Sequence, residues 1–288
     1  MSSFPVRLCL LVCLVLPSAC AVHAPAATAP AATMVPAGPM TPQAGPSQPP
    51  WVAPVYLAGT RIDAIALLGP PPPEGSEAAG RDLEGVLAAQ LAARQAGTRA
   101  RAIADADVSC TRFADALGDA AGSAGAQPAL QFATTTALQA STVIGAAKAY
   151  WHRPRPFLVS DRVERLADVA PGAAPDSPAL DARDHSSYPS GHAAFGLACA
   201  IVLAQLVPEQ RTALFARARS YAESREIVGA HFPSDIEAGR LAAAAAMAAI
   251  QQNPGFQQEL LEIRPGLRRA LGLAPMPRAL ATPSADTR

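Results

Sequence analysis

Two cations stand close together near the middle of the sequence. Lys148 is the only lysine among 23 basic residues, which favours a position that needs a compact ammonium group instead of a planar guanidinium. Arg155 follows after six intervening residues, and Pro154 and Pro156 flank it. Because proline fixes the backbone and ends a helix, we expect Arg155 on a rigid extended segment beside the end of the helix that carries Lys148. The two cations are therefore held near one point.

A turn with the sequence Tyr-Pro-Ser-Gly-His occupies residues 188–192 and leads directly into an apolar stretch. Ser190 stands where a helix N-cap is expected, and Gly191 and His192 provide amides of the first turn. Free amides and the helix dipole favour an anion at such a position. An ordinary capped helix start gives the same pattern, so both interpretations of this turn stay open.

A histidine and a carboxylate lie four residues apart in a third cluster. Ser224 and Arg225 come first, followed by His231 and then Asp235. Pro233 ends one predicted helix and the next begins at once, so the Asp235 carboxylate can reach the His231 ring. A carboxylate that holds one imidazole nitrogen fixes the tautomer and leaves the other nitrogen free to attack. A purely structural His–Asp pair is the alternative.

An arginine lies on the apolar face of the helix that precedes this third cluster. The face follows helical spacing and consists of Leu214, Ala218, Tyr221, Arg225 and Val228. A charged residue on such a face needs a partner. Together the three clusters supply three cations, a hydroxyl group, helix-start amides and two histidines. They contain no acidic cluster suited to a hard metal ion.

Helices are the only elements that the sequence predicts. Apolar periodicity, caps and prolines place a helix after a cap at 75–77 with Leu83, Val86, Leu87 and Leu91 on one face, and others at 99–117, 128–151, 161–167, 191–207, 209–228 and 234–251. No alternation of residues is long enough to predict a sheet. We therefore expect an all-α fold, a single-domain helical bundle.

The composition excludes some functions. The chain has 23 basic and 23 acidic residues, a balance that argues against a nucleic-acid partner. Aromatic residues make up only 5%, and alanine is abundant, which favours closely packed helices. The apolar stretches Ala193–Val207 and Leu241–Ile250 are shorter than a membrane span. The mature protein is expected to be soluble or only tethered.

The N-terminal part of the chain has the features of an export signal and a tether. Residues 1–21 combine a single charge at Arg7 with the apolar run Leu8–Leu16, as a signal peptide does. Residues 22–54 are mostly Ala, Pro, Thr and Gly, which predicts a disordered tether. Cys20 follows a segment that resembles the lipobox of bacterial lipoproteins, so lipidation at Cys20 and cleavage just after it both stay open.

We expect the remaining sequence to form one domain at residues 55–273, followed by a flexible tail at 274–288. Cys110 and Cys199 are the only cysteines of that domain. An oxidising compartment would permit a disulfide between them, whereas a buried free cysteine is equally ordinary. The sequence leaves this pairing open.

The three clusters resemble the three-part signature of the superfamily that contains type 2 phosphatidic acid phosphatases, bacterial class A acid phosphatases and vanadium haloperoxidases. The matching positions are Lys148, Arg155, Pro156, Ser190, Gly191, His192, Arg225, His231 and Asp235. Over about residues 65–250 the chain looks like a class A acid phosphatase, because segments 67–73, 104–107, 153–157 and 229–235 are also similar. The departures are Ala193, where threonine is common, and the long tether.

The resemblance implies a metal-independent acid phosphatase with no cofactor, folded as the helical bundle of that superfamily. His231 would attack phosphorus to form a phosphohistidine, Asp235 would orient it, and His192 would act as acid and then as base. The implied ligands of the phosphoryl oxygens are Lys148, Arg155, Ser190, Gly191 and Arg225.

The same resemblance implies small phosphomonoesters as partners, such as nucleotides, aryl phosphates or sugar phosphates, in a broad range. It further implies phosphotransfer to alcohols, an optimum at acidic pH and a homo-oligomer. With the signal peptide, we expect a periplasmic or secreted enzyme. Its only link to a membrane would be a lipid anchor at Cys20, which would hold it at the outer membrane.

Three other functions remain in competition at this stage. A vanadate-dependent haloperoxidase would use the same ligands, with His231 bonded to vanadium, but such enzymes are typically much larger. A membrane lipid phosphatase is disfavoured because its transmembrane helices are missing. A tethered phosphate-binding protein without catalysis would need neither His192 nor His231.

Overall fold

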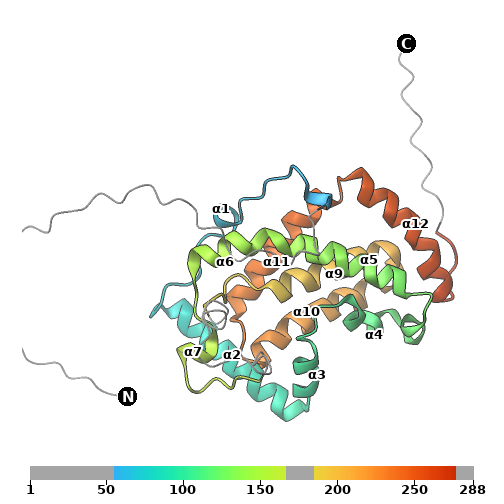
Figure 1. Cartoon of the computed structure of the whole chain (residues 1–288). Helices are drawn as coiled ribbons and strands as arrows, with labels where there is room; N and C mark the ends of the chain where they lie inside the picture. Colours follow the sequence, from blue (N-terminus) through green and yellow to red (C-terminus); the bar gives the residue numbers. More distant parts are fainter. Residues whose placement is uncertain (1–54, 167–184, 277–288) are drawn as a thin grey trace, which may run out of the picture. The chain divides into compact units, whose positions relative to one another are not determined.

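All regular elements in the described part of the chain are helical. The computed structural model describes residues 55–166 and 185–276, and no strand occurs in these ranges (Figure 1). The expectation of an all-α fold is therefore confirmed. Within the same ranges, no helix is both long and apolar enough to cross a membrane. The predicted signal peptide, the predicted tether and residues 277–288 of the predicted tail lie outside the described residues.

The α-helices are, in chain order, α1 (Ala64–Leu68), α2 (Glu77–Ala96), α3 (Arg99–Ala104), α4 (Ala114–Leu117), α5 (Gln127–Ser141), α6 (Gly145–Trp151), α7 (Pro156–Val159), α9 (Gly191–Leu206), α10 (Arg211–Ile227), α11 (Pro233–Ile250) and α12 (Pro254–Ala270). Short 3₁₀ turns are η1 (Val55–Leu57), η2 (Cys110–Phe113), η3 (Asp119–Gly122), η4 (Thr142–Ile144) and η5 (Pro208–Gln210).

Side-chain caps start two helices where the sequence predicts them. The hydroxyl of Ser76 accepts a hydrogen bond from the Ala79 amide at the start of α2. The hydroxyl of Ser190 accepts one from the Ala193 amide at the start of α9. Each bond satisfies an amide that has no partner within its own helix. The polar cluster at 188–192 thus ends on a well-defined helix N-terminus.

Helix α9 lies at the centre of the fold, packed against α5, α10 and α11 (Figure 1). Its residues are apolar on several faces, and most of them are buried. Small residues let the neighbours approach closely: a Cβ at Gly196 would lie 2.7 Å from Cδ1 of Tyr221 on α10. Because α9 and α10 each carry part of the signature, this packing fixes the distance between those parts.

A disulfide joins Cys110 in η2 to Cys199 in α9. The two residues are 89 positions apart in sequence, and their Cα atoms are 5.8 Å apart. Both are fully buried. The pairing that the sequence leaves open is therefore present, and it ties the α3–α5 region to the central helix.

Two predictions about helices need correction. The helix expected at 99–117 is divided into α3, η2 and α4, because the chain turns after Asp105 and buries its carboxylate among arginines. Residues 161–166 form turns and bends, not the short helix expected there. Helices α1, α7 and the amphipathic α12 were not predicted from the sequence.

The helical faces are largely as expected. The face of α10 made by Leu214, Ala218, Tyr221, Arg225 and Val228 is buried, as its spacing predicts. On α2, Val86 is fully buried and Leu83 and Leu87 pack beside it. Leu91 is 54% exposed, so it does not share their buried environment.

Candidate active site

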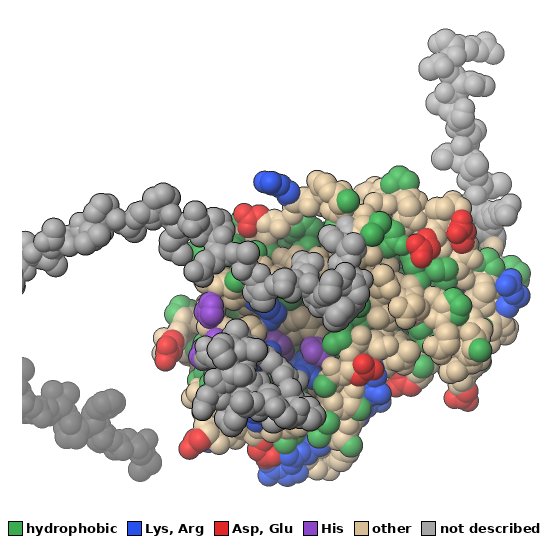
Figure 2. Space-filling model, in the orientation of Figure 1, with side chains coloured by type: hydrophobic (Ala, Val, Ile, Leu, Met, Phe, Trp, Pro, Cys, Tyr) green, Lys and Arg blue, Asp and Glu red, His purple; other side chains and the backbone are tan. Residues whose placement is uncertain are grey.

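The three polar clusters meet at one end of the central helices. Nζ of Lys148 donates to the backbone oxygen of Ser186, 2.5 Å away, which links the first cluster to the segment before the second. Arg155 donates through Nη1 to the Ala230 oxygen at 2.8 Å, directly beside His231. In the space-filling view, histidine and basic side chains gather in a hollow (Figure 2).

A backbone bond joins the second cluster to the third. The Ser190 amide donates to the Asp235 carbonyl oxygen at 2.8 Å, so the N-termini of α9 and α11 touch. Gly239 makes this contact feasible, because a Cβ there would lie only 2.2 Å from the Ser190 oxygen. The Gly191 amide thereby begins α9 next to the residues that follow His231. The three sequence clusters thus form one spatial group.

His231 and Asp235 face each other as their spacing predicts. Nδ1 of His231 lies 3.5 Å from Oδ2 of Asp235, and both side chains are almost completely buried. The pair brackets the break between α10 and α11, where Pro233 starts the new helix. This arrangement turns Nδ1 toward a carboxylate and leaves Nε2 as the nitrogen with access to a substrate.

The environment of His231 keeps its imidazole neutral. Burial lowers the pKa of His231 well below its usual value, and the positive charges of Arg155, Lys148 and Arg225 lower it further, with a contribution from His192. A neutral imidazole has a lone pair for nucleophilic attack, which an imidazolium lacks. The same charges would attract an anion, so one arrangement favours both the substrate and the nucleophile.

Lys148 is also perturbed. Burial, together with the charge of Arg155, lowers the pKa of Lys148 to about 7, and the carboxylate of Asp235 opposes that change. The ammonium group is therefore charged at acidic pH and loses its proton near neutrality. A bound phosphate dianion would favour the charged form.

His192 projects from the first turn of α9. Its Nε2 lies 3.1 Å from the backbone oxygen of Ala106. A carbonyl oxygen only accepts hydrogen bonds, so Nε2 carries the hydrogen in this geometry and Nδ1 is the nitrogen that can exchange a proton. The ring of His192 also lies 5.9 Å from that of Tyr221, whose hydroxyl donates to the Asp107 oxygen.

Arg225 is the largest fully buried side chain of the described residues. Its neighbour Ser224 donates to the carboxylate of Asp105, which also accepts hydrogen bonds from Arg217 and Arg112. The segment 105–107 thus contacts the side chains of Ser224, His192 and Tyr221, which lie next to the site. The same segment is one of those that resemble class A acid phosphatases in sequence.

Three polar residues that contact the site were not named as site residues from the sequence. Asp235 Oδ1 accepts a hydrogen bond from Nη1 of Arg153 at 2.6 Å, and its Oδ2 accepts one from the Ser187 hydroxyl at 2.6 Å. Asp82 of α2 in turn accepts one from Nη2 of Arg153 at 2.8 Å. Arg153 lies between two residues with assigned roles and could have been suspected. Asp82 and Ser187 carry no comparable signal.

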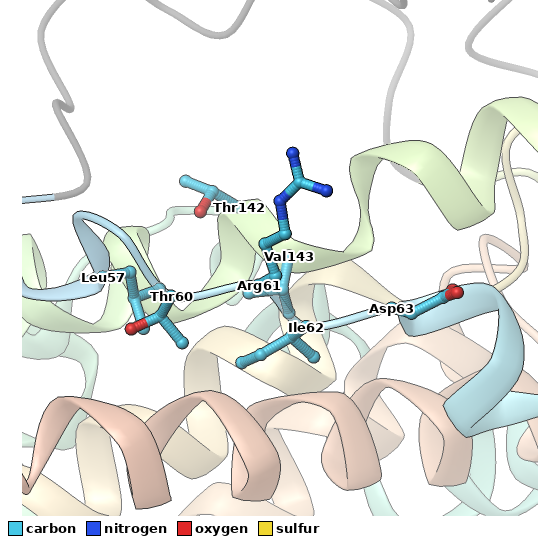
Figure 3. A pocket seen from close by; sticks show the side chains of 7 residues that line it. All are labelled: Leu57, Thr60, Arg61, Ile62, Asp63, Thr142 and Val143. Atoms are coloured by element: carbon cyan, nitrogen blue, oxygen red, sulfur yellow. The ribbon is translucent and has the colours of Figure 1, made fainter.

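A surface depression lies apart from these residues. A depression of about 380 Å³ is lined by none of the signature residues but by Leu57, Thr60, Arg61, Ile62, Asp63, Thr142 and Val143 (Figure 3). In the part of the chain that the structure describes, no group of three or more His, Cys, Asp or Glu side chains could hold a metal ion.

Comparison with known proteins places the chain in one family. The PAP2 superfamily model matches residues 128–257, which include all three clusters. The chain is 32% identical over 216 residues to the non-specific acid phosphatase of Providencia stuartii, covering 71% of this chain and 81% of that protein. It is 37% identical over 118 residues to the non-specific acid phosphatase of Salmonella typhimurium, covering 41% of this chain and 44% of the relative.

An acid phosphatase of Zymomonas mobilis is 32% identical over 127 residues, which cover 44% of this chain and 45% of that protein. The helical fold and these matches define the class of protein: the chain belongs to the PAP2 superfamily. Within it, the chain is an enzyme of the bacterial class A acid phosphatase kind.

Proposed function

We propose that the enzyme hydrolyses phosphate monoesters through a phosphohistidine at His231, without a metal ion. The observation that carries this proposal is the position of His231, whose Nδ1 faces Asp235 while three protein cations surround the ring. A buried neutral imidazole beside cations is arranged to attack a bound anion. The cations would neutralise the charge that a metal ion neutralises in other phosphatases.

In the first step, Nε2 of His231 attacks phosphorus and the bond to the ester oxygen breaks. His192 gives a proton to the leaving oxygen, so the alcohol departs neutral. In the second step, His192 takes a proton from water, the oxygen of water attacks phosphorus, and the phosphorus–nitrogen bond breaks. Inorganic phosphate leaves, and both histidines return to their starting states.

The phosphoryl oxygens would be held by side chains and amides from all three clusters. Lys148, Arg155 and Arg225 supply positive charge, and Ser190 with the Gly191 amide supplies hydrogen bonds at the N-terminus of α9. The phosphoryl oxygens become equatorial and nearly coplanar in the transition state, so donors that are fixed for that geometry stabilise it more than the ground state.

The proposed substrates are small phosphomonoesters in a broad range. Relatives from Providencia and Salmonella are named non-specific acid phosphatases, which supports a site that recognises the phosphoryl group more than the leaving group. A phosphoenzyme that waits for water can also react with an alcohol, so we include phosphotransfer in the proposal. The Cys110–Cys199 disulfide and the signal-like residues 1–21 support a periplasmic or secreted location.

Hydrolysis of p-nitrophenyl phosphate by the full chain, at pH 5–8 with EDTA present, tests this function. We expect turnover that resists the chelator and is lost in a folded His231→Ala variant. Rapid quenching should yield an acid-labile, base-stable phosphoenzyme, as a phosphorus–nitrogen bond requires. An added alcohol should lower the phosphate yield per nitrophenol released. Turnover that EDTA abolishes, or that His231→Ala retains, would refute the mechanism.

A further inference from the structure

Arg153 connects two buried carboxylates that lie far apart in the sequence. Its Nη1 donates to Oδ1 of Asp235 at 2.6 Å, and its Nη2 donates to Oδ2 of Asp82 at 2.8 Å. The three side chains are at most 9% exposed. The guanidinium also lies over the ring of Phe232, 4.1 Å from its centroid. One arginine therefore bridges α2 and the partner of the proposed nucleophile.

Asp82 reaches the start of α11 by a second route. Its Oδ1 accepts a hydrogen bond from the Ser234 amide at 3.1 Å, and its Oδ2 accepts one from the Ser234 hydroxyl. Arg153 also donates to that hydroxyl, at 2.8 Å. The first turn of α11, which carries Asp235, is thereby attached to α2 through both its backbone and its side chains.

This network has a clear electrostatic consequence. Burying a charge is costly unless it is paired, and Arg153 satisfies two carboxylates at once. If Asp82 were absent, the guanidinium would be balanced by Asp235 alone. The negative charge that Asp235 presents to His231 would then be smaller. With Asp82 in place, two carboxylates share one guanidinium, so the group keeps one net negative charge beside the imidazole.

From these contacts we infer that Asp82 and Arg153 are positioning residues for the phosphatase reaction, which act on His231 through Asp235. The inference rests on the proposed function, because it assumes that His231 is the nucleophile. Neither residue belongs to the three signature clusters. Neither is among the proposed ligands of the phosphoryl group, which are Lys148, Arg155, Arg225 and the start of α9.

The two residues should shift the titration of His231 in opposite directions. The charged groups around that ring are Lys148, Arg155, Arg225, His192 and Asp235. Asp82→Asn removes a negative charge behind Asp235, so the pKa of His231 should fall. Arg153→Gln removes a positive charge, so it should rise. A simple loss of packing has no such dependence on the sign of the charge.

Another carboxylate near this network does not obscure that test. Burial and the carboxylates of Glu223, Asp82 and Asp235 raise the pKa of Glu226 to about 8. Glu226 is therefore mostly neutral at the acidic pH values where His231 titrates. Its charge stays constant across the acidic limb of the rate profile.

The experiment uses full-length Asp82→Asn, Arg153→Gln and Arg153→Lys variants. Steady-state hydrolysis of p-nitrophenyl phosphate is measured from pH 4 to 8, with inorganic phosphate as a competitive inhibitor. The matched control is Glu84→Gln. Glu84 lies on α2, as Asp82 does, and its exposed ion pair with Arg162 is lost in this variant. Circular dichroism and thermal unfolding show which variants are folded.

We expect kcat to fall about 10- to 100-fold in Asp82→Asn and Arg153→Gln, because a small misplacement of a reacting group has effects of that order. KM and the inhibition constant of phosphate should stay within about threefold, since the phosphate ligands are intact. The acidic limb of kcat/KM should move to lower pH in Asp82→Asn and to higher pH in Arg153→Gln. Arg153→Lys should restore part of kcat, and Glu84→Gln should match the wild type.

Wild-type kcat in both charge variants, or limbs that move in the same direction, would overturn the inference. A rise in KM at unchanged kcat would also overturn it, because it would assign these residues to substrate binding. If Arg153→Gln does not fold, Asp82→Asn and Arg153→Lys decide the question by the same criteria. Absence of phosphohistidine in the wild type would instead refute the proposed function, and the inference with it.

Discussion

Nε2 of His192 lies 3.1 Å from the backbone oxygen of Ala106, so a carbonyl from a distant turn determines which imidazole nitrogen can exchange protons. The turn that carries this carbonyl is fixed on both sides. Asp105 is buried among Arg112, Arg217 and Ser224, and the Asp107 oxygen accepts a hydrogen bond from Tyr221. The proposed acid is therefore oriented by backbone that has no role in the signature.

This orientation leads to a prediction about leaving groups. His192→Asn removes the proton donor, so kcat for an alkyl phosphate should fall about 10²- to 10⁴-fold, which is the usual contribution of a general acid. Nitrophenolate leaves without protonation, so formation of the phosphoenzyme from p-nitrophenyl phosphate should fall much less. His192 is also the proposed base of the second step, so the phosphoenzyme should be hydrolysed slowly in the variant and should accumulate. The first turnover should therefore release nitrophenol in a burst. Equal losses of phosphorylation rate for both substrates would contradict this role for His192.

The pKa of Lys148 predicts the alkaline limb of the rate profile. Because burial and Arg155 lower that pKa to about 7, the ammonium group is charged below neutral pH and neutral above it. The attraction to the phosphate dianion should therefore be lost as pH rises, and kcat/KM should decline above pH 7. Lys148→Arg keeps a charge at all these values, so its alkaline limb should move to higher pH, although kcat should be lower.

Measurement of kcat/KM from pH 5 to 9 with one substrate checks this prediction, because the ionisation of the substrate is then common to both enzymes. An unchanged alkaline limb in Lys148→Arg would show that another group causes the decline. Arg101→Lys, at an exposed ion pair with Asp115, is a suitable control.

The signature residues could be named from sequence because the three compact clusters resemble the signature of a known superfamily. Proline, glycine and serine next to Arg155, Ser190 and His231 define the local backbone, but each cluster taken alone also allowed a purely structural role. The positions of α9, α10 and α11 were predicted for a related reason. Their apolar spacing is regular, and caps or prolines mark their ends.

Other features depend on tertiary contacts that sequence periodicity does not contain. The predicted helix at 99–117 is interrupted because Asp105 is buried with Arg217, 112 positions away. Asp82 joins the site through Arg153 and Ser234, which are 71 and 152 positions away. The helix α12 does have a local signal, an Asn253 cap followed by Pro254. Its internal Pro265 disrupts the helical pattern that would have identified it.

The buried position of Asp105 predicts a stability that depends on pH. Burial by itself would raise the pKa of this carboxyl group, but hydrogen bonds from Arg217, Ser224 and Arg112 outweigh it and leave the pKa below its usual value. A lowered pKa in the folded state means that the ionised carboxylate stabilises the fold above the unfolded pKa of about 4. That contribution is lost as pH falls through the folded pKa.

Asp105→Asn should therefore lower the free energy of unfolding by about 3–5 kcal/mol at pH 7, because it leaves the buried guanidinium of Arg217 and the partly buried one of Arg112 without the Asp105 carboxylate. The deficit should shrink at pH 3. Urea unfolding of both proteins at the two pH values measures it, and Glu77→Gln, at an exposed carboxylate paired with Arg81, is the control. A deficit that is equal at both values would mean that packing, not charge, explains the effect.

Gly239 predicts a second link between packing and activity. A Cβ at this position would lie 2.2 Å from the Ser190 backbone oxygen and 3.2 Å from Cβ of Ala193, so α11 could not stay this close to the start of α9. Gly239→Ala should displace the Ser190 cap and the Gly191 amide from the phosphoryl group. We expect kcat/KM to fall about 10- to 100-fold and stability to fall by about 1–3 kcal/mol.

The matched control for that variant is Gly266→Ala. Gly266 also lies within a helix, but a Cβ there would have no neighbour within 4 Å. The substitution should leave kcat/KM unchanged and should raise stability slightly, because alanine loses less backbone entropy than glycine in a helix. Kinetics and thermal unfolding of both variants test the argument. If Gly239→Ala keeps wild-type kcat/KM, the approach of α11 to α9 does not position the phosphate-binding amides.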